Sequence, residues 1–196
     1  MYSKRDERFY LPGLGGHHLL SYDLKFVKKP YKPEFHEFQF RDIPQSLAYE
    51  YDLPELFCSS SRTEYLVESP SGEERFLIKW YADSNLVSKK VSYETQMFMV
   101  FREEETPEGK LMRYTDDIGD LCIFISKGGE AFCVQSSSFP FTNESFPGLL
   151  TNTIYFIGFG FSFYDLASKT TSSLQTPEES LLDGNAIPHW FPPSSS

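Results

Sequence analysis

Phe146-Pro-Gly-Leu-Leu-Thr-Asn-Thr-Ile-Tyr-Phe156, followed closely by Phe163-Tyr-Asp-Leu166, is the stretch that decides the fold class of this chain. Its Pro-Gly pair predicts a turn, and the β-branched and aromatic run that follows predicts a strand. Two glycines interrupt that run before a second aromatic strand. The stretch therefore predicts turn, strand, turn and strand, which is typical of an antiparallel sheet.

The composition of the whole chain agrees with a sheet-rich protein. The 196 residues are 40% hydrophobic, enough to build the core of one domain or of part of a larger one. Aromatic residues are plentiful, with 19 Phe, 12 Tyr and 2 Trp. Such side chains favour pleated, half-buried surfaces, where they pack against neighbours on adjacent strands.

Four strands upstream form one predicted antiparallel unit. Residues 65–67 and 75–81 flank a Ser-Pro-Ser-Gly turn, the pattern of a β-hairpin. Residues 95–101 alternate between apolar and polar side chains, as a half-buried strand does. An acidic turn at residues 103–109 leads into a fourth strand at residues 110–114, whereas residues 83–92 are interpreted as a polar insertion.

A second unit repeats this arrangement. Residues 121–125 and 131–134 form a predicted hairpin around a Lys-Gly-Gly turn, which continues into strands at residues 154–156 and 161–166. Four-stranded units that recur every ~40 to 50 residues are typical of β-propeller blades. We therefore expect an all-β chain of antiparallel four-stranded units, a partial propeller of about three to four blades.

The N-terminal third is less regular. Short strands are predicted at residues 9–11 and 17–24, and residues 35–40 alternate with period two. A helical turn or short helix fits residues 45–57, where Pro54 suits a first helical position.

These motifs together resemble the plant KIB-type β-propeller family, a domain of unknown function often found behind an F-box. The resemblance is clearest over residues 56–192, within a predicted domain at residues 9–192, and leaves residues 1–8 and 193–196 as expected disordered tails. The segments that carry it share their order along the chain: Tyr65-Leu-Val-Glu-Ser69, Phe76-Leu-Ile-Lys-Trp80, Phe98-Met-Val-Phe101, Gly119-Asp120, Phe146-Pro-Gly148, Asn152, Ile154-Tyr-Phe156, Tyr164-Asp-Leu166 and Ile187-Pro-His-Trp-Phe191.

The resemblance implies a non-catalytic interaction domain, because members of the family act in protein recognition, some of them as substrate receptors of F-box ubiquitin ligases. It supplies no catalytic residues. No F-box pattern is visible before the predicted strands, so direct binding to a Skp-type adaptor is not expected. The chain is interpreted as a truncated paralogue, a partial gene model or a fragment whose edge strands need a partner.

Net charge and cysteine content limit the classes of partner and the cellular compartment that we expect. A formal net charge of −10 argues against nucleic acid, whose binders present a basic face, and the basic run at residues 25–32 fits a solvated loop. The longest apolar stretch, residues 154–163, is shorter than the ~20 residues that a membrane helix needs. Three scattered cysteines and the lack of an export signal predict an intracellular protein of the cytoplasm or nucleus, with an organelle as the alternative.

A search for chemistry predicts no enzyme, no metal site and no cofactor. The four histidines lack metal-binding spacing, since His17 and His18 would point to opposite faces of a strand. The glycines at residues 13–16 lack the rest of a phosphate-binding motif, and no GxSxG nucleophile motif occurs.

Three hypotheses about function stay open at this point. The first is protein interaction through the loops at residues 84–93 and 103–109. The second is a small-ligand or carbohydrate binder with a stacking platform made of Trp80, Tyr81, Trp190 and Phe191, although Trp80 also fits a core position. The third is a degenerate duplicate without a function.

Overall fold

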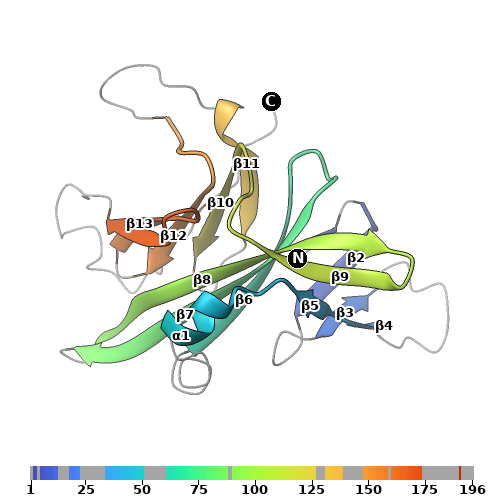
Figure 1. The fold of residues 1–196 in the computed structure, drawn as a ribbon. Helices are drawn as coiled ribbons and strands as arrows, with labels where there is room; N and C mark the ends of the chain where they lie inside the picture. The colour runs from blue at the N-terminus through green and yellow to red at the C-terminus, as the bar shows by residue number, and fades with distance from the viewer. Residues whose placement is uncertain are drawn as a thin grey trace.

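The computed structural model consists of three small β-sheets (Figure 1). It describes residues 2–3, 5–12, 18–22, 34–50, 61–87, 90–126, 131–138, 148–158, 160–173 and 190. Several features singled out in the sequence lie outside the described residues: residues 13–17, 25–32, 146–147, 189 and 193–196, together with Cys58 and Phe191.

The N-terminal sheet has the strand order β1-β2-β3-β4, with all neighbours antiparallel. Its strands are β1 (Tyr2–Ser3), β2 (Arg8–Pro12), β3 (His18–Tyr22) and β4 (Glu34–Glu37). Within the segment expected as a disordered tail, β1 pairs with the start of β2, and Ser3 and Asp6 accept hydrogen bonds from Arg75.

The central sheet has the order β5-β9-β8-β7-β6. It consists of β5 (Gln39–Arg41), β6 (Ser61–Glu68), β7 (Arg75–Val87), β8 (Lys90–Thr106) and β9 (Gly109–Thr115). The predicted antiparallel unit of four strands is confirmed by the pairing of β6, β7, β8 and β9. At its edge, β5 adds in parallel to β9.

Two details of this region differ from the sequence-based interpretation. The single strand expected at residues 35–40 is divided at Phe38, a buried residue, so that β4 and β5 belong to different sheets. Residues 83–87 and 90–92 are not a polar insertion but extend β7 and β8, which pair as far as Val87 and Lys90. Backbone ladder bonds hold these polar ends in strand conformation without an apolar alternation.

The turn between β6 and β7 follows the chemistry of its sequence. The Gly72 amide donates a hydrogen bond to the Ser69 carbonyl at 2.9 Å, which closes the turn. Gly72 has a φ of 76°, a left-handed conformation that favours glycine.

The C-terminal sheet has the order β11-β10-β12-β13-β14. Its strands are β10 (Leu121–Ser126), β11 (Phe132–Gln135), β12 (Thr153–Gly158), β13 (Gly160–Asp165) and β14 (Thr170–Ser173). The two predicted hairpins are present, but β12 pairs in parallel with β10. The unit is therefore not antiparallel throughout, and β14 adds a strand that the sequence did not indicate.

The central sheet lies between the other two and packs apolar side chains on both faces (Figure 1). Along β7, Phe76, Ile78 and Trp80 face the C-terminal sheet. Leu77 and Tyr81 belong to the cluster on the opposite side, with Tyr10 and Leu19 of the N-terminal sheet. Three stacked sheets of this kind are consistent with partial propeller blades.

One short helix, α1 (Gln45–Glu50), and one 3-10 turn, η1 (Ser136–Ser138), accompany the sheets. Leu47 of α1 is fully buried in the cluster between the N-terminal and central sheets, so the helix covers part of that core.

Candidate interaction site

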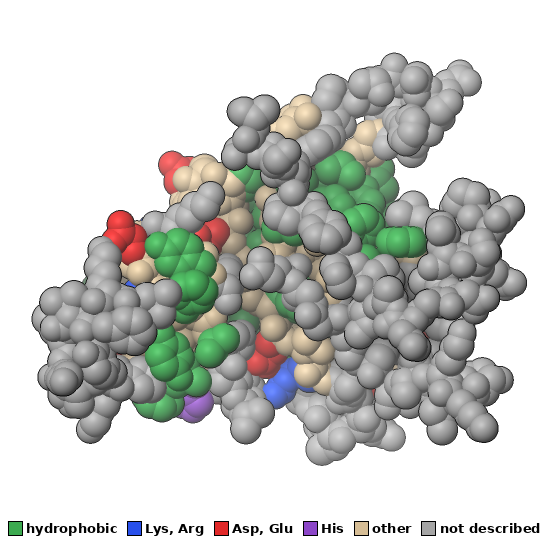
Figure 2. All heavy atoms as spheres, turned by 180° about the vertical axis from the view of Figure 1, so that it is seen from behind, with side chains coloured by type: hydrophobic (Ala, Val, Ile, Leu, Met, Phe, Trp, Pro, Cys, Tyr) green, Lys and Arg blue, Asp and Glu red, His purple; other side chains and the backbone are tan. Residues whose placement is uncertain are grey.

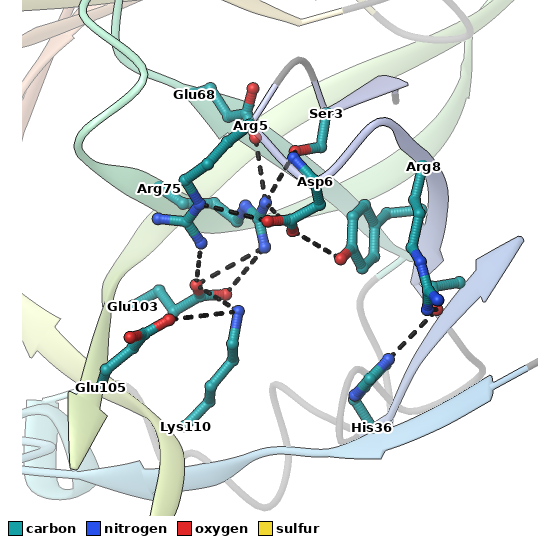
Figure 3. Close-up of polar contacts among 12 residues, drawn as sticks. Ser3, Arg5, Asp6, Arg8, His36, Glu68, Arg75, Glu103, Glu105 and Lys110 are labelled. Carbon is teal, nitrogen blue, oxygen red and sulfur yellow. Dashed lines mark hydrogen bonds and ion pairs between the residues drawn. The ribbon is translucent and has the colours of Figure 1, made fainter. Parts of the chain in front are cut away.

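A buried arginine joins the N-terminal sheet to the central sheet (Figure 3). Arg75 begins β7 on the face toward the N-terminal sheet, and its side chain is 1% exposed. Its Nη2 lies 2.6 Å from Asp6 Oδ2 and 3.0 Å from Glu68 Oε1, and donates a further hydrogen bond to Ser3 Oγ at 2.9 Å. A planar guanidinium can satisfy several acceptors in this way, which a lysine ammonium does less well.

Glu103 continues the network from the interior toward the surface. Its buried carboxylate lies 3.1 Å from Arg75 Nη1, 2.6 Å from Arg5 Nη2 and 3.1 Å from Lys110 Nζ. Burial alone would raise the pKa of Glu103, but the charge of Arg75 and the hydrogen bonds from Arg5 and Lys110 lower it below its ordinary value. Glu103 is therefore held as a carboxylate between three cations.

Asp6 has a similar environment on the N-terminal side of the network. The Tyr10 hydroxyl donates a hydrogen bond to Asp6 Oδ2 at 2.5 Å, and the Tyr10 ring lies 4.7 Å from the Arg75 guanidinium carbon. Burial would raise the pKa of Asp6, but the hydrogen bonds from Tyr10 and Arg75 lower it well below its ordinary value. Burial and the Asp6 carboxylate raise the pKa of Tyr10 to about 12. We call Ser3, Arg5, Asp6, Glu68, Arg75, Glu103 and Lys110 the Arg75 network.

Lys110 connects this network to a surface hollow of about 350 Å³. The hollow lies between β5, β9 and the β8–β9 turn, and the charged side chains that line it are Arg41, Asp42, Glu108, Lys110 and Arg113. Its floor is formed by paired strands, and the turn is closed by a 2.7 Å hydrogen bond from Thr106 Oγ1 to the Gly109 carbonyl.

The charges of the hollow are unequal. Arg113 pairs with Asp42 and, at 2.9 Å, with Glu104. Glu108 is the second acid that lines the hollow, besides Asp42. Arg41 is exposed at the end of β5. Three cations and two acids line the hollow, but Glu103 and Glu105 also pair with Lys110, and Glu104 pairs with Arg113.

The structure separates the loop residues that the sequence proposed for interaction. Residues 84–87 and 90–93 are strand, and their side chains lie outside the described part. The turn expected over residues 103–109 is shorter, because β8 continues to Thr106. Glu103 is buried in the Arg75 network, so only the end of that segment, from Thr106 to Gly109, lines the hollow.

The aromatic platform proposed for a carbohydrate is not present as expected. Trp80 and Tyr81 are 2% and 1% exposed and belong to the cores on opposite sides of the central sheet. Trp190 lies against Phe124 and Phe161 and donates a 3.1 Å hydrogen bond to the Ile125 carbonyl. The two core residues cannot stack on a ligand at the surface.

Lys79 is a second charged residue that the sequence analysis missed. It is buried on the same face of β7 as Arg75, with Nζ 4.0 Å from the centre of the Phe40 ring. Burial lowers its pKa to about 8, while the charge of Glu64 opposes that shift. Arg75 and Lys79 are both charged residues at inward positions of β7, where the alternation predicts apolar side chains. Two of the acids that pair with Arg75, Asp6 and Glu103, lie far from it in the sequence.

The cysteines of the described residues lie outside the Arg75 network. Cys122 and Cys133 are buried thiols, and burial raises their pKa to about 11 and about 12. Across the described ranges, His, Cys, Asp and Glu form no group that could hold a metal ion. Within the same ranges, no helix is long and apolar enough to cross a membrane.

Comparison with known proteins identifies one family. The family model described as KIB1-4 beta-propeller matches residues 1–181, which is most of the chain and includes the residues before Leu56. No curated protein and no solved structure matches the chain.

Proposed function

Because the chain belongs to the KIB1-4 beta-propeller family, we propose that it is a non-catalytic protein-recognition domain and that the hollow beside the β8–β9 turn is its binding site. The observation that carries this proposal is the hollow itself, about 350 Å³ in volume and lined by exposed charges on paired strands. Binding groups are commonly placed on a turn that a rigid scaffold positions.

The charges of the hollow favour an acidic partner segment. Lys110 and Arg113 are already paired with carboxylates, so Arg41, which is exposed at the end of β5, is the cation that would meet a carboxylate of a partner peptide. An ion pair with Glu103 holds the Lys110 side chain in place, and ion pairs with Glu104 and Asp42 hold that of Arg113. Side chains that are already ordered lose less conformational entropy when a partner binds.

Domains of this family are typically associated with an F-box. In a ligase whose F-box is supplied by another polypeptide, a protein that binds the hollow would be a candidate substrate for ubiquitination. The alternative of carbohydrate binding loses its motivation, because Trp80 and Tyr81 are core residues.

Quantitative affinity capture tests this proposal. The immobilised full chain and its Arg41→Glu variant are exposed to the same extract, and bound proteins are quantified by mass spectrometry. We expect at least one protein to lose ~10-fold or more of its binding to the variant, because charge reversal places like charges together. Binding should also weaken as salt increases.

Lys169→Glu is the matched control. It makes the same change of charge at a turn outside the hollow, so captured proteins should be retained. If no protein distinguishes Arg41→Glu from Lys169→Glu, the hollow is not the recognition site.

A further inference from the structure

The N-terminal sheet has one apolar face that belongs to none of the buried clusters of the described residues, and we call it the open face. Six apolar side chains lie on it: Tyr2, Phe9, Leu11, Leu20, Tyr22 and Phe35. His18 and Glu37 share its edge. Phe35 is 70% exposed and Leu11 is 50% exposed. Figure 2 shows hydrophobic side chains gathered at this end of the molecule, on the left.

The open face is organised in two rows that cross the strands. Tyr2, Phe9 and Tyr22 are paired in register across β1, β2 and β3. The second row is Leu11, Leu20 and Phe35, across β2, β3 and β4. Aligned apolar rows on a flat sheet fit the face of another sheet.

The rest of the molecule supports this interpretation. The opposite face of the N-terminal sheet buries Tyr10 and Leu19 against the central sheet. The central sheet is itself apolar on both faces and is covered on both. The central sheet, which has two apolar faces, is thus an inner layer of the stack. The N-terminal sheet also has two apolar faces, but only one of them belongs to a buried cluster of described residues.

The other end of the stack suggests what covers the open face. The outer face of the C-terminal sheet carries Phe124 and Tyr155, which are both buried. Trp190 lies against Phe124 at a ring-centroid distance of 5.1 Å and is fixed by its hydrogen bond to Ile125. A head-to-tail contact with another copy would have to displace Trp190, whereas a contact between two open faces displaces no described residue.

We propose that two copies of this chain associate through their open faces in a two-fold symmetric dimer. A contact of the same patch with itself closes after two copies, so no larger assembly forms. The five most exposed side chains of the patch contribute roughly 500 Å² per copy, taking ~200 Å² for each large apolar side chain. Two copies would therefore bury roughly 1,000 Å² in total, at the low end for specific interfaces, which fits a dimer that forms only at high concentration.

The charge of the chain sets the conditions for the dimer. Two copies, each with a formal net charge of −10, repel one another. Screening by salt reduces this repulsion and leaves apolar burial unchanged. Dimerisation should therefore strengthen with salt, whereas binding at the hollow should weaken.

Sedimentation velocity over a concentration series of the full chain tests the proposal. The wild type should shift from the mass of one chain to that of two as concentration rises, at lower concentrations in high salt. Phe35→Glu should raise the dimer dissociation constant by at least ~30-fold, the effect of losing an interface anchor. Circular dichroism should show that this exposed substitution leaves the sheets intact.

Ile43→Glu is the matched control, because Ile43 is another exposed apolar residue, 41% exposed, outside the N-terminal sheet. It should dimerise like the wild type. A wild type that stays monomeric at high concentration and high salt, assemblies larger than two, or equal effects of Phe35→Glu and Ile43→Glu would each overturn the proposal. None of these results depends on the hollow, so this proposal and the recognition proposal fail separately.

Discussion

At the scale of single residues, Arg75 shows how one side chain holds two sheets together. It occupies an inward position of β7, where Leu77 and Tyr81 are apolar. A buried cation is tolerated there only because carboxylates from three separate segments surround it. The alternation along β7 was predictable from the sequence, but Asp6 and Glu103 lie too far away in the chain for their approach to be foreseen.

Replacement of Arg75 by methionine should be strongly destabilising. The change leaves Asp6, Glu68 and Glu103 close together without their shared cation, which typically costs about 3–5 kcal/mol for a buried ion pair. Arg75→Lys should be intermediate, because an ammonium keeps the charge but loses the planar fork. Chemical denaturation of the full chain measures the free energy of unfolding.

Glu74→Gln provides the comparison for Arg75. Glu74 pairs with Arg102 in a partly exposed ion pair at 3.3 Å. Pairs of this kind contribute about 0–1 kcal/mol. If Glu74→Gln cost as much as Arg75→Met, burial of the network would not be the source of its stability.

At the scale of elements, local turn chemistry predicted the hairpins, whereas the order of strands depended on long-range contacts. The β6–β7 hairpin was predictable because Ser69 and Gly72 specify its turn. The parallel pairing of β10 with β12 was not, since periodicity does not indicate which strands are neighbours. Asn152, part of the family resemblance, lies immediately before β12 and has a φ of 53°.

Asn152 joins two turns, so Asn152→Ala should destabilise the chain. Its Oδ1 accepts a hydrogen bond from the Ile118 amide at 2.8 Å, and its Nδ2 donates one to the Asp116 carbonyl at 2.9 Å. The loss of both bonds should lower the free energy of unfolding by about 1–3 kcal/mol. Thermal and urea unfolding of the purified variant provide the measurement.

Lys169→Ala is the comparison for Asn152→Ala at another residue of positive φ. Lys169 also has a positive φ, 58°, at the turn before β14. Asparagine tolerates the left-handed region better than lysine or alanine does, so Asn152→Ala loses both its hydrogen bonds and this preference, whereas Lys169→Ala loses neither. An equal loss of stability in the two variants would show that the Asn152 side chain contributes nothing.

At the scale of the whole molecule, three sheets stack in chain order, and the family resemblance anticipated this arrangement. Several residues that carried the resemblance, such as Ile154, Phe156 and Tyr164, are buried core residues. The recognition surface was less predictable. The hollow is formed by β5, β9 and a turn that meet only after β5 adds to the edge of the central sheet.

The stability of the whole molecule should fall in acid. Folding lowers the pKa of Asp6 and Glu103, so below the ordinary carboxyl pKa of about 4 the unfolded chain binds more protons than the folded chain. The stability that these carboxylates contribute is complete above that pH and is lost as the pH falls toward their lowered values. Urea unfolding at a series of pH values from neutral to acidic measures the slope.

Glu103→Gln should be less stable at neutral pH and should show a weaker dependence on acid. Glu104→Gln, a change at the neighbouring residue outside the Arg75 network, should retain the slope of the wild type. Identical slopes in all three proteins would contradict the role assigned to Glu103.

The positions of the two tryptophans have a spectroscopic consequence. Trp80 lies between the central and C-terminal sheets, stacked on Phe98 and edge-on to Phe156, while Trp190 covers the outer face of the C-terminal sheet. The chain contains no other tryptophan. Because indole emission depends on the polarity around the ring, each tryptophan is an intrinsic fluorophore for a different boundary. Separation of the sheets and loss of the outer cover would thus be distinguishable without any added label.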